Sequence, residues 1–386
     1  MNDSWPTVQL AKLCEVFTDG DWVESKDQSS EGIRLVQTGN VGEGVFKDRG
    51  EKARHISETT FKRLRCTEIF EGDSLISRLP DPIGRSCIVP DTGKRMITAV
   101  DCTIVRFDRS RLLPEFFDLY CRTPEYLQAV DAEATGTTRK RISREKLGKV
   151  PIPVPPLSEQ TRIVETMTDA LESIAGAQAT AQKNLENARS ILKSHTHALF
   201  RRRGEGWVEK TINQVSINLD SRRIPITRNM RKAGKYPYYG ASGIVDRVAD
   251  YIFDCDALLV SEDGANLLMR ATPIAFSVSG KYWVNNHAHI LKFENIATQR
   301  FVEFYLETIQ IDQYIRGAAQ PKLTQKALNS IPIPIPESLA AQVTLVESIE
   351  SLSHKTRRLE ALYETKLAAL GALKKSLLHR AFTGQL

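Results

Sequence analysis

A short proline-rich segment occurs twice in this chain, and the repeat constrains the fold more than any other feature. Residues 150–156 read VPIPVPP, and residues 331–337 read IPIPIPE. Proline fixes φ, lacks an N–H donor and biases the preceding residue toward extended conformations. Each segment therefore predicts a stiff, extended strap with apolar side chains to pack. A proline-rich ligand for a small recognition domain is the alternative, but two copies, each just before a helical pattern, favour a structural strap.

The repeat extends well beyond the two straps. Matching residues lie 181 positions apart up to the strap, and 182 apart after one inserted residue. The pairs are Gly136 with Gly317, Ile142 with Leu323, Leu147 with Leu328, Gln160 with Gln342, Val164 with Val346, Glu165 with Glu347, Ser194 with Ser376, His197 with His379, and Phe200 with Phe382. The chain is therefore interpreted as two equivalent halves, each with a variable block, a strap and a segment of roughly 45 residues.

Each long segment has the spacing of an amphipathic helix. From residue 158 to 200, apolar side chains recur alternately after four and three positions, with a polar break at Asn184. This spacing is typical of a coiled-coil seam. Ser158 is the expected N-cap, and Glu159 follows in the first turn, where the helix dipole favours a carboxylate. The same rhythm returns after the second strap, with Ser338 as the expected N-cap.

The two apolar seams predict that the helices pack on each other. The seams include Ile191 in the first helix and Leu359 and Leu373 in the second. A helix from 158 to 200 would be about 65 Å long at about 1.5 Å per residue, and so long an apolar stripe cannot remain exposed. Two equivalent helices pack most simply antiparallel, about a pseudo-twofold axis. A structural rod and a partner-docking surface are both open interpretations of this pair.

The two variable blocks share a general pattern. Each starts near a tryptophan, Trp5 or Trp207, and contains short β-branched runs separated by Gly, Asp and Asn. Such runs are typical of strands with turns between them, and helical stretches follow. We expect an α+β fold in which two globular mixed α/β domains are separated by two long helices packed as an antiparallel coiled coil, with a pseudo-twofold internal repeat. The expected boundaries are 1–157, 158–200 (central helix), 201–336 and 337–386 (C-terminal helix).

No motif in the chain predicts a catalytic centre. The sequence has no GxxxxGK[ST] nucleotide loop, no GxGxxG after a strand, and no Asp/Asn-Pro-Pro-aromatic tetrad of a methyltransferase. Asn286, His287 and His289 could ligate a metal, but lone histidines are more often structural or hydrogen-bonded. We expect no catalytic residues, no metal site and no cofactor bound to this chain.

The sequence predicts a cytoplasmic protein. The first residues, MNDSWPTVQL, have no basic start followed by an apolar run, so we expect no signal peptide. No run reaches the about 18 apolar residues that a membrane span needs. The six cysteines are scattered without a CxxC pair, which argues against a zinc module and fits a reducing compartment.

The positive charge of the chain is concentrated in two runs. The formal net charge is +6 at pH 7. Residues 137–146 hold five basic residues and one Glu, and residues 221–235 hold six basic residues and no acid. Such runs are compatible with binding to nucleic-acid phosphates. A solvated, charge-rich loop is the alternative for either run.

The blocks, straps and helices together resemble one known family. The most specific stretches are VPIPVPPLSEQTRIV and IPIPIPESLAAQVTLV across the straps, KYPYYGASGIVD with LLVSEDG in the second block, and the helix endings SHTHALF and SLLHRAF. With these stretches the chain resembles the specificity subunit of a type I restriction–modification system over nearly its whole length. The second strap departs from the family's usual PLxEQ continuation and reads ESLAAQ.

The resemblance implies a DNA-recognition subunit without catalytic activity. Each variable block would be a target recognition domain that reads one half of a bipartite sequence in double-stranded DNA, and the helix pair would set the unread spacer. The same helices would dock two modification subunits, which carry S-adenosylmethionine and methylate adenine. Restriction (translocase/nuclease) subunits would join for cleavage.

Candidate DNA contacts lie in polar turns of both blocks. Phosphate contacts are expected from the loop before the first strap, which comprises Gly136, Thr137, Thr138, Arg139 and Lys140, and from its counterpart with Gly317, Gln320 and Lys322. Further candidates for phosphate or base contacts are Thr38, Asn40, Arg78 and Arg85 in the first block, and Tyr238, Tyr239, Ser242, Glu262, Asp263, Asn266 and Asn286 in the second. Turn chemistry or packing is the alternative for each, and the two tyrosines are more often core residues.

Other interpretations of the sequence remain open. A coiled-coil scaffold whose globular heads bind protein partners would have the same helices and would bind DNA without sequence preference. A remnant of a single-chain restriction–methylation enzyme is disfavoured because the methyltransferase tetrad is absent. A spare specificity gene that serves only as a recombination donor would have the same sequence as an active one.

Overall fold

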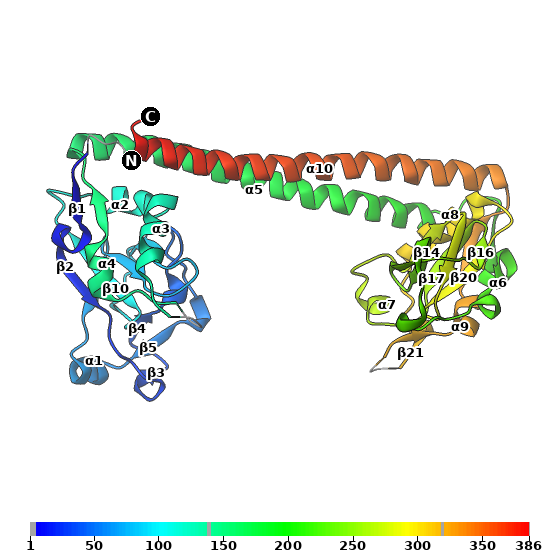
Figure 1. The fold of residues 1–386 in the computed structure, drawn as a ribbon, viewed down its shortest axis with the longest axis horizontal. Coiled ribbons are helices and arrows are strands. Elements are labelled where there is room, and N and C mark those ends of the chain that lie inside the picture. The colour runs from blue at the N-terminus through cyan, green and yellow to red at the C-terminus, as the bar shows by residue number, and fades with distance from the viewer. Residues whose placement is uncertain (1–4, 137–139, 318–319, 386) are drawn as a thin grey trace. The chain divides into compact units, whose positions relative to one another are not determined.

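The computed structural model describes residues 5–136, 140–317 and 320–385, which form two compact units (Figure 1). The first unit comprises Met1–Ala181 with Lys366–Leu386, and the second comprises Gln182–Thr365. Two helices of 45 residues each, α5 (Leu157–Arg201) and α10 (Leu339–Thr383), contribute to both units. The division between the units therefore falls within the long helices.

The first variable block contains short strands and helices. The strands are β1 (Thr7–Gln9), β2 (Cys14–Asp19), β3 (Gln28–Ser29), β4 (Ile33–Val36), β5 (Arg54–Ile56), β6 (Glu68–Ile69), β7 (Ser74–Ser77), β8 (Ser86–Ile88), β9 (Met96–Thr98), β10 (Cys102–Phe107) and β11 (Pro151–Pro153). The helices are α1 (Glu58–Leu64), α2 (Pro114–Tyr120), α3 (Pro124–Glu133) and α4 (Arg144–Lys149). They build a four-stranded sheet in the order β2-β10-β7-β8 and a five-stranded sheet in the order β3-β5-β4-β9-β6.

The second variable block follows a related plan. Its strands are β12 (Trp207–Thr211), β13 (Ile217–Asn218), β14 (Ala233–Gly240), β15 (Gly243–Val248), β16 (Phe253–Asp254), β17 (Ala257–Ser261), β18 (Ala275–Val278), β19 (Lys281–Val284), β20 (Ala288–Lys292), β21 (Ile315–Arg316), β22 (Lys322–Leu323) and β23 (Pro332–Pro336). The helices are α6 (Ile212–Val215), α7 (Asn266–Met269), α8 (Ile296–Thr308) and α9 (Gln325–Asn329), and a 3-10 turn, η5, spans Asp220–Arg222. Two four-stranded sheets run β13-β20-β17-β18 and β15-β14-β19-β16.

One sheet is common to both blocks, although their sequences differ there. The order β2-β10-β7-β8 of the first unit corresponds to β13-β20-β17-β18 of the second, and all pairs in both sheets are antiparallel. The central strands β7 and β17 are wholly buried, with the sequences SLIS and ALLVS. Strands covered on both faces read as continuous apolar or small runs. The internal repeat therefore extends into the variable blocks.

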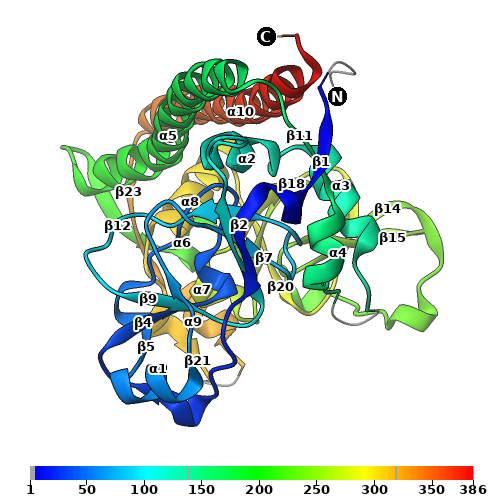
Figure 2. The ribbon, with the colours of Figure 1, turned by 90° about the vertical axis from the view of Figure 1, so that its left-hand side faces the viewer.

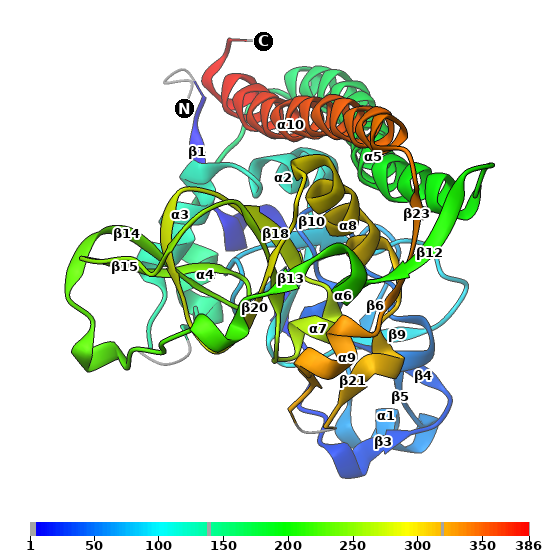
Figure 3. The same cartoon turned by 90° about the vertical axis from the view of Figure 1, so that its right-hand side faces the viewer.

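Each strap closes its block by pairing with the first strand of that block. In the first unit β11 lies antiparallel to β1, with Thr7 opposite Pro153 (Figure 2). In the second unit β23 lies antiparallel to β12, with Trp207 opposite Pro336 (Figure 3). Proline fits such two-stranded ladders, since it cannot donate into a central strand. The extended conformation predicted for both straps is confirmed.

The long helices pair antiparallel within each unit. In the second unit Arg189 of α5 lies 3.5 Å from Glu360 and 2.9 Å from Glu364 of α10, while Phe200 shares a core with Ile349. Later residues of α5 therefore contact earlier residues of α10, so the two helices run in opposite directions. In the first unit Ile163 and Met167 of α5 share a core with Leu378, Ala381 and Phe382 of α10. The predicted antiparallel pairing is confirmed.

The end of each helix inserts a phenylalanine into an aromatic core. Phe382 of α10 lies 5.2 Å from both Phe116 and Tyr120 of the first block, measured between ring centroids. Its repeat partner Phe200, near the end of α5, lies 5.2 Å from Phe301 of the second block, with the rings edge to face. Aromatic pairs at these separations add stability beyond their buried area. The repeat thus has the same anchoring role in both units.

The N-cap predicted for the first long helix is wrong. α5 begins at Leu157, and the amides of Glu159 and Gln160 both donate to the carbonyl of Pro156, so Ser158 is inside the helix and is not its N-cap. Ser338, by contrast, directly precedes α10, and its carbonyl accepts from the amide of Gln342.

The predicted seam also drifts off the interface. Ile191, Leu359 and Leu373 are exposed by 43%, 38% and 46%, because a helix with 3.6 residues per turn rotates against a strict 3.5-residue repeat. None of the helices in the described ranges is long and apolar enough to cross a membrane.

Candidate nucleic-acid interface

In the second unit, several predicted residues meet around the β21–β22 hairpin. Gly317 in its turn has φ of 87°, and a Cβ there would lie 2.5 Å from the carbonyl of Gln320, so the turn requires glycine. At the base of the hairpin, the amide of Leu323 donates to the carbonyl of Glu262 at 2.8 Å. The segment that follows β17 is therefore fixed to the hairpin.

A buried histidine lies directly beneath this hairpin. His289 on β20 is 1% exposed; its Nε2 lies 2.7 Å from the carbonyl of Leu323 and its Nδ1 lies 2.5 Å from Oδ2 of Asp220. The other oxygen of Asp220 accepts from the amide of Ile290 at 2.9 Å. Burial acts to raise the pKa of Asp220, but the hydrogen bonds from His289 and Ile290 lower it below its ordinary value overall. Asp220 is therefore ionised at neutral pH.

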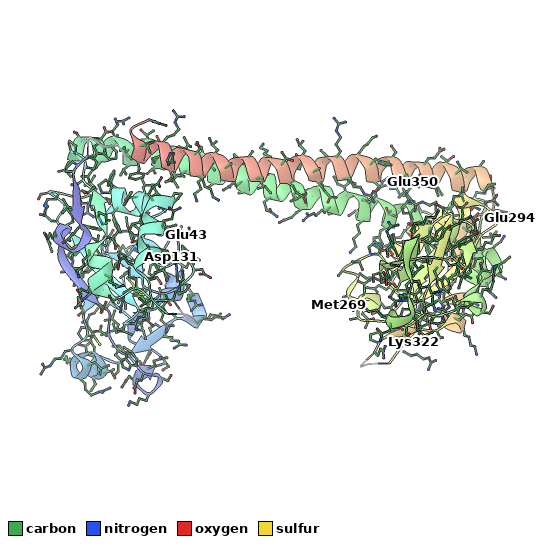
Figure 4. The ribbon with its side chains drawn as sticks, viewed as in Figure 1. Glu43, Asp131, Met269, Glu294, Lys322 and Glu350 are labelled. Atoms are coloured by element: carbon green, nitrogen blue, oxygen red, sulfur yellow. The ribbon has the colours of Figure 1, made fainter. Side chains whose placement is uncertain are left out.

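Glu262 extends this network toward the surface. Its Oε2 lies 2.6 Å from Nη1 of Arg223, and its Oε1 lies 3.1 Å from Nζ of Lys322. Burial acts to raise the pKa of Glu262, but Arg223, His289 and Lys322 lower it overall. Figure 4 labels Lys322 on the surface of the second unit, where half of its side chain is exposed. Two candidates from the sequence, Glu262 and Lys322, thus form an ion pair.

Asp220, Glu262 and His289 also have the composition of a metal site. One ligand atom from each lies within 4.8 Å of the others. However, Arg223 donates to Glu262 and to the carbonyl of Ala288, and both ring nitrogens of His289 already have partners. The protein's own cations occupy the space between the carboxylates, so this group is an ion-pair network.

Other candidates of the second unit divide into surface and interior residues. Ser242 and Asn286 are exposed in turns, and Gln320 is exposed in the hairpin loop. Asp263 lies 2.8 Å from the ring of His287, which is about half exposed. Ser242, Asn286 and Gln320 remain available for a ligand at the surface, whereas both carboxylate oxygens of Asp263 bond to His287.

Tyr238, Tyr239 and Asn266 have partners within the second unit. The hydroxyl of Tyr238 bonds to both backbone groups of Ile226, and the side chain is fully buried. Tyr239 packs edge to face on Tyr282 with a centroid distance of 5.8 Å. The amide of Asn266 bonds to both backbone groups of Thr272 at 2.9 Å. Tyr238 is therefore a core residue, whereas Tyr239 and Asn266 are half-buried and make these packing and turn contacts.

The basic run at 221–235 is not a uniformly solvated loop. Arg223 folds into the buried network, Arg231 lies 4.4 Å above the ring of Tyr238, and Arg222 lies 5.5 Å above the ring of Phe253. Arg222 is nevertheless exposed, as are Arg228, Lys232 and Lys235. These four are the side chains of the run that can reach phosphates.

In the first unit, three of the four candidates outside the strap loop are buried and have protein partners. The guanidinium of Arg85 donates to the carbonyls of Val41, Leu79, Pro82 and Thr38. Asn40 is 4% exposed and bonds to the amide of Gln37 and the carbonyl of Lys47.

Arg78 is 4% exposed, lies 3.3 Å from Asp19, and donates to the carbonyls of Val100 and Ile142. As with Asn40 and Arg85, its polar atoms hold loops together. Of the four, only Thr38 is partly exposed, and its carbonyl accepts from Arg85. In this structure Asn40, Arg78 and Arg85 therefore do not present their polar groups to a ligand.

The loop before the first strap is described in part. Gly136 has φ of 108°, a conformation that favours glycine, and Lys140 is exposed with its Nζ 2.9 Å from Asp131. Figure 4 labels Asp131, which lies on α3. The predicted contacts Thr137, Thr138 and Arg139 lie outside the described residues.

The sequence interpretation missed two features of the second unit. Asp220 immediately precedes the basic run, and only its contact with His289 shows that it belongs to the network. Leu268 and Met269 on α7 are 49% and 73% exposed, next to Arg270, whose guanidinium donates to the carbonyls of Leu306 and Ile309. No periodic pattern marks a helix of four residues, so neither feature had a signal that could be read in advance.

Comparison with known proteins identifies one family of relatives. The chain matches the family model of the type I restriction modification DNA specificity domain twice, over residues 2–187 and 204–367. A curated relative from Haemophilus influenzae, described as a type I restriction enzyme specificity subunit, is 33% identical over 147 residues. That match spans 38% of this chain and 37% of the relative's length.

Solved structures share the fold along the whole chain. One solved chain comes from work on complex assembly and conformational transition of the type I R-M system. It matches this chain with a TM-score of 0.78 at 17% sequence identity, and the match covers 99% of that chain and 100% of this one. The HsdS subunit from Thermoanaerobacter tengcongensis has a TM-score of 0.64 at 17% identity, with 98% of that chain and 100% of this one covered.

Proposed function

Since this chain belongs to the family of type I restriction–modification DNA specificity subunits, we propose that each of its two blocks recognises one half of a bipartite sequence in double-stranded DNA. The observation that carries the proposal is the double match to the specificity-domain model, over residues 2–187 and 204–367. Each match covers one variable block, and the two blocks share a four-stranded sheet and a strap. Two such domains in one chain give a reader with two half-sites, as a dimeric helix-turn-helix protein does with two chains.

The exposed polar residues of the second block supply the chemistry for this reading. Arg228, Lys232 and Lys235 neutralise phosphates and give an affinity that depends on salt. Asn286 and Gln320 carry amides of the kind that pair with adenine in the major groove. The ion pair between Glu262 and Lys322 and the backbone hydrogen bond between Leu323 and Glu262 tie β22, close to Gln320, to the second block.

The long helices are proposed to set the unread spacer between the half-sites. α5 and α10 are continuous over 45 residues each and join the two blocks. At about 1.5 Å per residue, each helix is about 68 Å long. Because the phenylalanine anchors and the shared apolar cores hold the helix pairing within each unit, helix length becomes a ruler for the spacer.

The same helices are proposed to dock two modification subunits. Three leucines of α10 are exposed: Leu359 by 38%, Leu362 by 58% and Leu373 by 46%. Exposed apolar side chains on a long helix mark a surface for a protein partner. S-adenosylmethionine would bind to these modification subunits, and restriction subunits would join the complex for cleavage.

The proposal is tested by single-molecule detection of methyladenine in genomic DNA. Cells carrying this gene with a cognate modification subunit are compared with cells that lack only this gene. The expected result is a split motif of two short half-sites around a fixed gap, lost on deletion. If purified protein and its complex instead bind all DNA duplexes equally, the protein-binding scaffold would be the better description.

A further inference from the structure

The short helix α7 lies beside the β21–β22 hairpin and carries two exposed apolar side chains, Leu268 and Met269 (Figure 1 and Figure 3). We propose that these two are specificity-determining residues of the second block, and that they contact the C5-methyl group of a thymine in the half-site that this block reads. The inference rests on the proposed DNA-recognition function and names the base chemistry that one loop would recognise.

The exposure of this pair is large for apolar side chains. Leu268 is 49% exposed and Met269 is 73% exposed, whereas Leu267 between them and the hairpin segment is 1% exposed and packs in the core of the block. Their exposed neighbours in the same loop carry no charge: Ala265, Ala271, Thr272 and Pro273. An uncharged, apolar patch on the surface marks a place of contact with a ligand or a partner.

The loop that carries the pair is fixed on both sides of α7. Before α7, the amide of Gly264 donates to the carbonyl of Pro321 at 3.0 Å, which ties the loop to the hairpin. After α7, the guanidinium of Arg270 donates to the carbonyls of Leu306 and Ile309 at the end of α8, at 3.1 and 3.0 Å. The pair therefore protrudes from a fixed loop, and its binding to a ligand orders little additional backbone.

The segments next to this loop carry the cations that a DNA contact needs. Lys322 forms a β-bridge with Asp263, just before α7, and half of its side chain is exposed. Arg316 on β21 and Lys326 on α9 are exposed as well. DNA interfaces combine such phosphate-binding cations with side chains that reach base edges. A stable protein interface would instead need about 800 Å² on each partner, far more than two side chains supply.

The chemistry of a leucine–methionine pair selects one feature of a base pair. Neither side chain binds a phosphate, and neither donates a hydrogen bond to a base edge. In the major groove the bases present hydrogen-bonding groups, and thymine also presents its C5-methyl group. That methyl group is the apolar feature that Leu268 and Met269 would cover. Burial of one methyl group gives about a fourfold gain in affinity.

The first block has an equivalent loop on the same frame. Strands β7 and β8 correspond to β17 and β18, so the loop at 78–85 takes the place of the loop at 262–274. Each loop starts with a backbone bond to the segment that leads to the strap. The amide of Ile142 donates to the carbonyl of Arg78 at 3.3 Å. The amide of Leu323, the repeat partner of Ile142, donates to the carbonyl of Glu262 at 2.8 Å.

The loop of the first block turns its apolar side chains inward. Leu79 and Ile83 are each 6% exposed, and Arg85 donates to the carbonyls of Leu79 and Pro82. The frame shared by both halves thus carries loops that differ in length and in the side chains that they expose. Recognition of a thymine methyl group through this loop should therefore be confined to one half-site.

The experiment removes the methyl group from the DNA and the apolar side chains from the protein. The bipartite target is first read from the methylated genome. The full chain in complex with its modification subunits is then titrated with target duplexes in which one thymine at a time is replaced by deoxyuridine, which lacks the methyl group and keeps the hydrogen-bonding groups. The wild type should lose about fourfold in affinity at one or more thymines of one half-site.

A double variant and a matched control assign this effect to the pair. Leu268→Ala combined with Met269→Ala should bind the thymine and deoxyuridine duplexes equally at that position. Ile296→Ala is the control, since Ile296 is 57% exposed at the start of α8, and it should keep the wild-type response to deoxyuridine. Figure 4 labels Met269 and Glu294, which is close to Ile296 in the chain, on opposite sides of the second unit. Thermal midpoints and assembly with the modification subunits are measured for both variants and should match the wild type.

The outcomes distinguish the inference from the proposed function. A wild type that discriminates at both half-sites but binds thymine and deoxyuridine equally at every position would overturn the inference. A deoxyuridine effect that survives in the double variant would overturn it too, as would loss of the modification subunits from the double variant, which would assign the pair to a protein contact. Binding by the wild type without discrimination at either half-site would overturn the proposed function itself.

Discussion

The side-chain amide of Gln160 donates a hydrogen bond of 2.8 Å to the carbonyl of Pro155, and so ties the first turn of α5 to the end of the first strap. Its repeat partner Gln342 donates to the carbonyl of Pro336, also at 2.8 Å. The two prolines are repeat partners, each the last residue but one of its strap, and both glutamines are buried. The angle at which each helix leaves its block is therefore fixed by one amide in each half.

Removing this amide should destabilise the chain. Gln160 is fully buried, and it also bonds to the amide of Leu113 and the carbonyl of Arg111. Each buried polar group that loses its hydrogen-bond partner lowers the free energy of unfolding by about 1–3 kcal/mol. Gln160→Ala should therefore lower the free energy of unfolding by about 3 kcal/mol in urea titrations. Gln182→Ala, on the exposed face of the same helix, is the control, and an equal effect of the two substitutions would contradict the clamp.

Arg85→Lys should reduce stability although it keeps the charge. The guanidinium of Arg85 donates to four carbonyls between 2.7 and 3.0 Å, and a lysine ammonium cannot reproduce this fan of donors. We expect a loss of about 2–4 kcal/mol, measured by chemical denaturation. Lys140→Ala, at an exposed site, should change stability by less than about 0.5 kcal/mol. A change of DNA selectivity in Arg85→Lys at full stability would argue for direct base contact instead.

Lengthening both helices should lengthen the spacer of the DNA target. An insertion of seven residues after Asn184 in α5, matched by seven after Lys366 in α10, keeps the heptad register and adds about 10 Å at 1.5 Å per residue. The gap should grow by about three base pairs at about 3.4 Å each, or binding should be lost. Methylome sequencing of cells with the variant gives the answer. An unchanged gap with full methylation would refute the ruler.

Asp21 should make the first unit less stable as the pH rises. Burial raises the pKa of its carboxyl from 3.8 to about 6, against a hydrogen bond from the amide of Thr67. Because the folded state holds the proton more tightly than the unfolded state, this contribution to stability is present below pH 3.8 and is lost up to about pH 6. Asp21→Asn keeps an acceptor for Thr67 and carries no charge.

Thermal midpoints across pH 4 to 7 test this directly. Asp21→Asn should match the wild type near pH 4 and exceed it at pH 7. Asp108→Asn is a control of opposite sign, because hydrogen bonds from Ser110 lower the pKa of Asp108. Parallel curves for Asp21→Asn and the wild type would show that the carboxyl is ionised throughout.

Patterns local in the sequence predicted most of the architecture. The straps, both long helices and their antiparallel pairing follow from proline stereochemistry and apolar spacing, which act over a few residues. The seam drifted at Ile191 and Leu359, since real helices depart from a strict heptad. The equivalence of the sheet strands β10 and β20 was not visible, because their sequences, CTIVRF and AHILK, differ although the strands share a place in the fold.

Candidate site residues were predicted less well, for a physical reason. A polar side chain at a turn can form hydrogen bonds either within the protein or with a ligand, and the sequence does not show which of these partners lies within reach. Arg78 and Arg85 find carbonyls inside the first block, whereas Lys322 stays at the surface of the second. Only distances between segments far apart in the chain decide between these outcomes.

The pairing of each strap with the first strand of its block also bears on how such chains diversify. Thr7 faces Pro153, and Trp207 faces Pro336, so each block enters and leaves through two neighbouring strands. A block whose first and last strands are neighbours can be replaced as a unit without changing the structure of the helices that it joins. A new target half could thus be acquired in one genetic exchange, with both helices and the other half left intact.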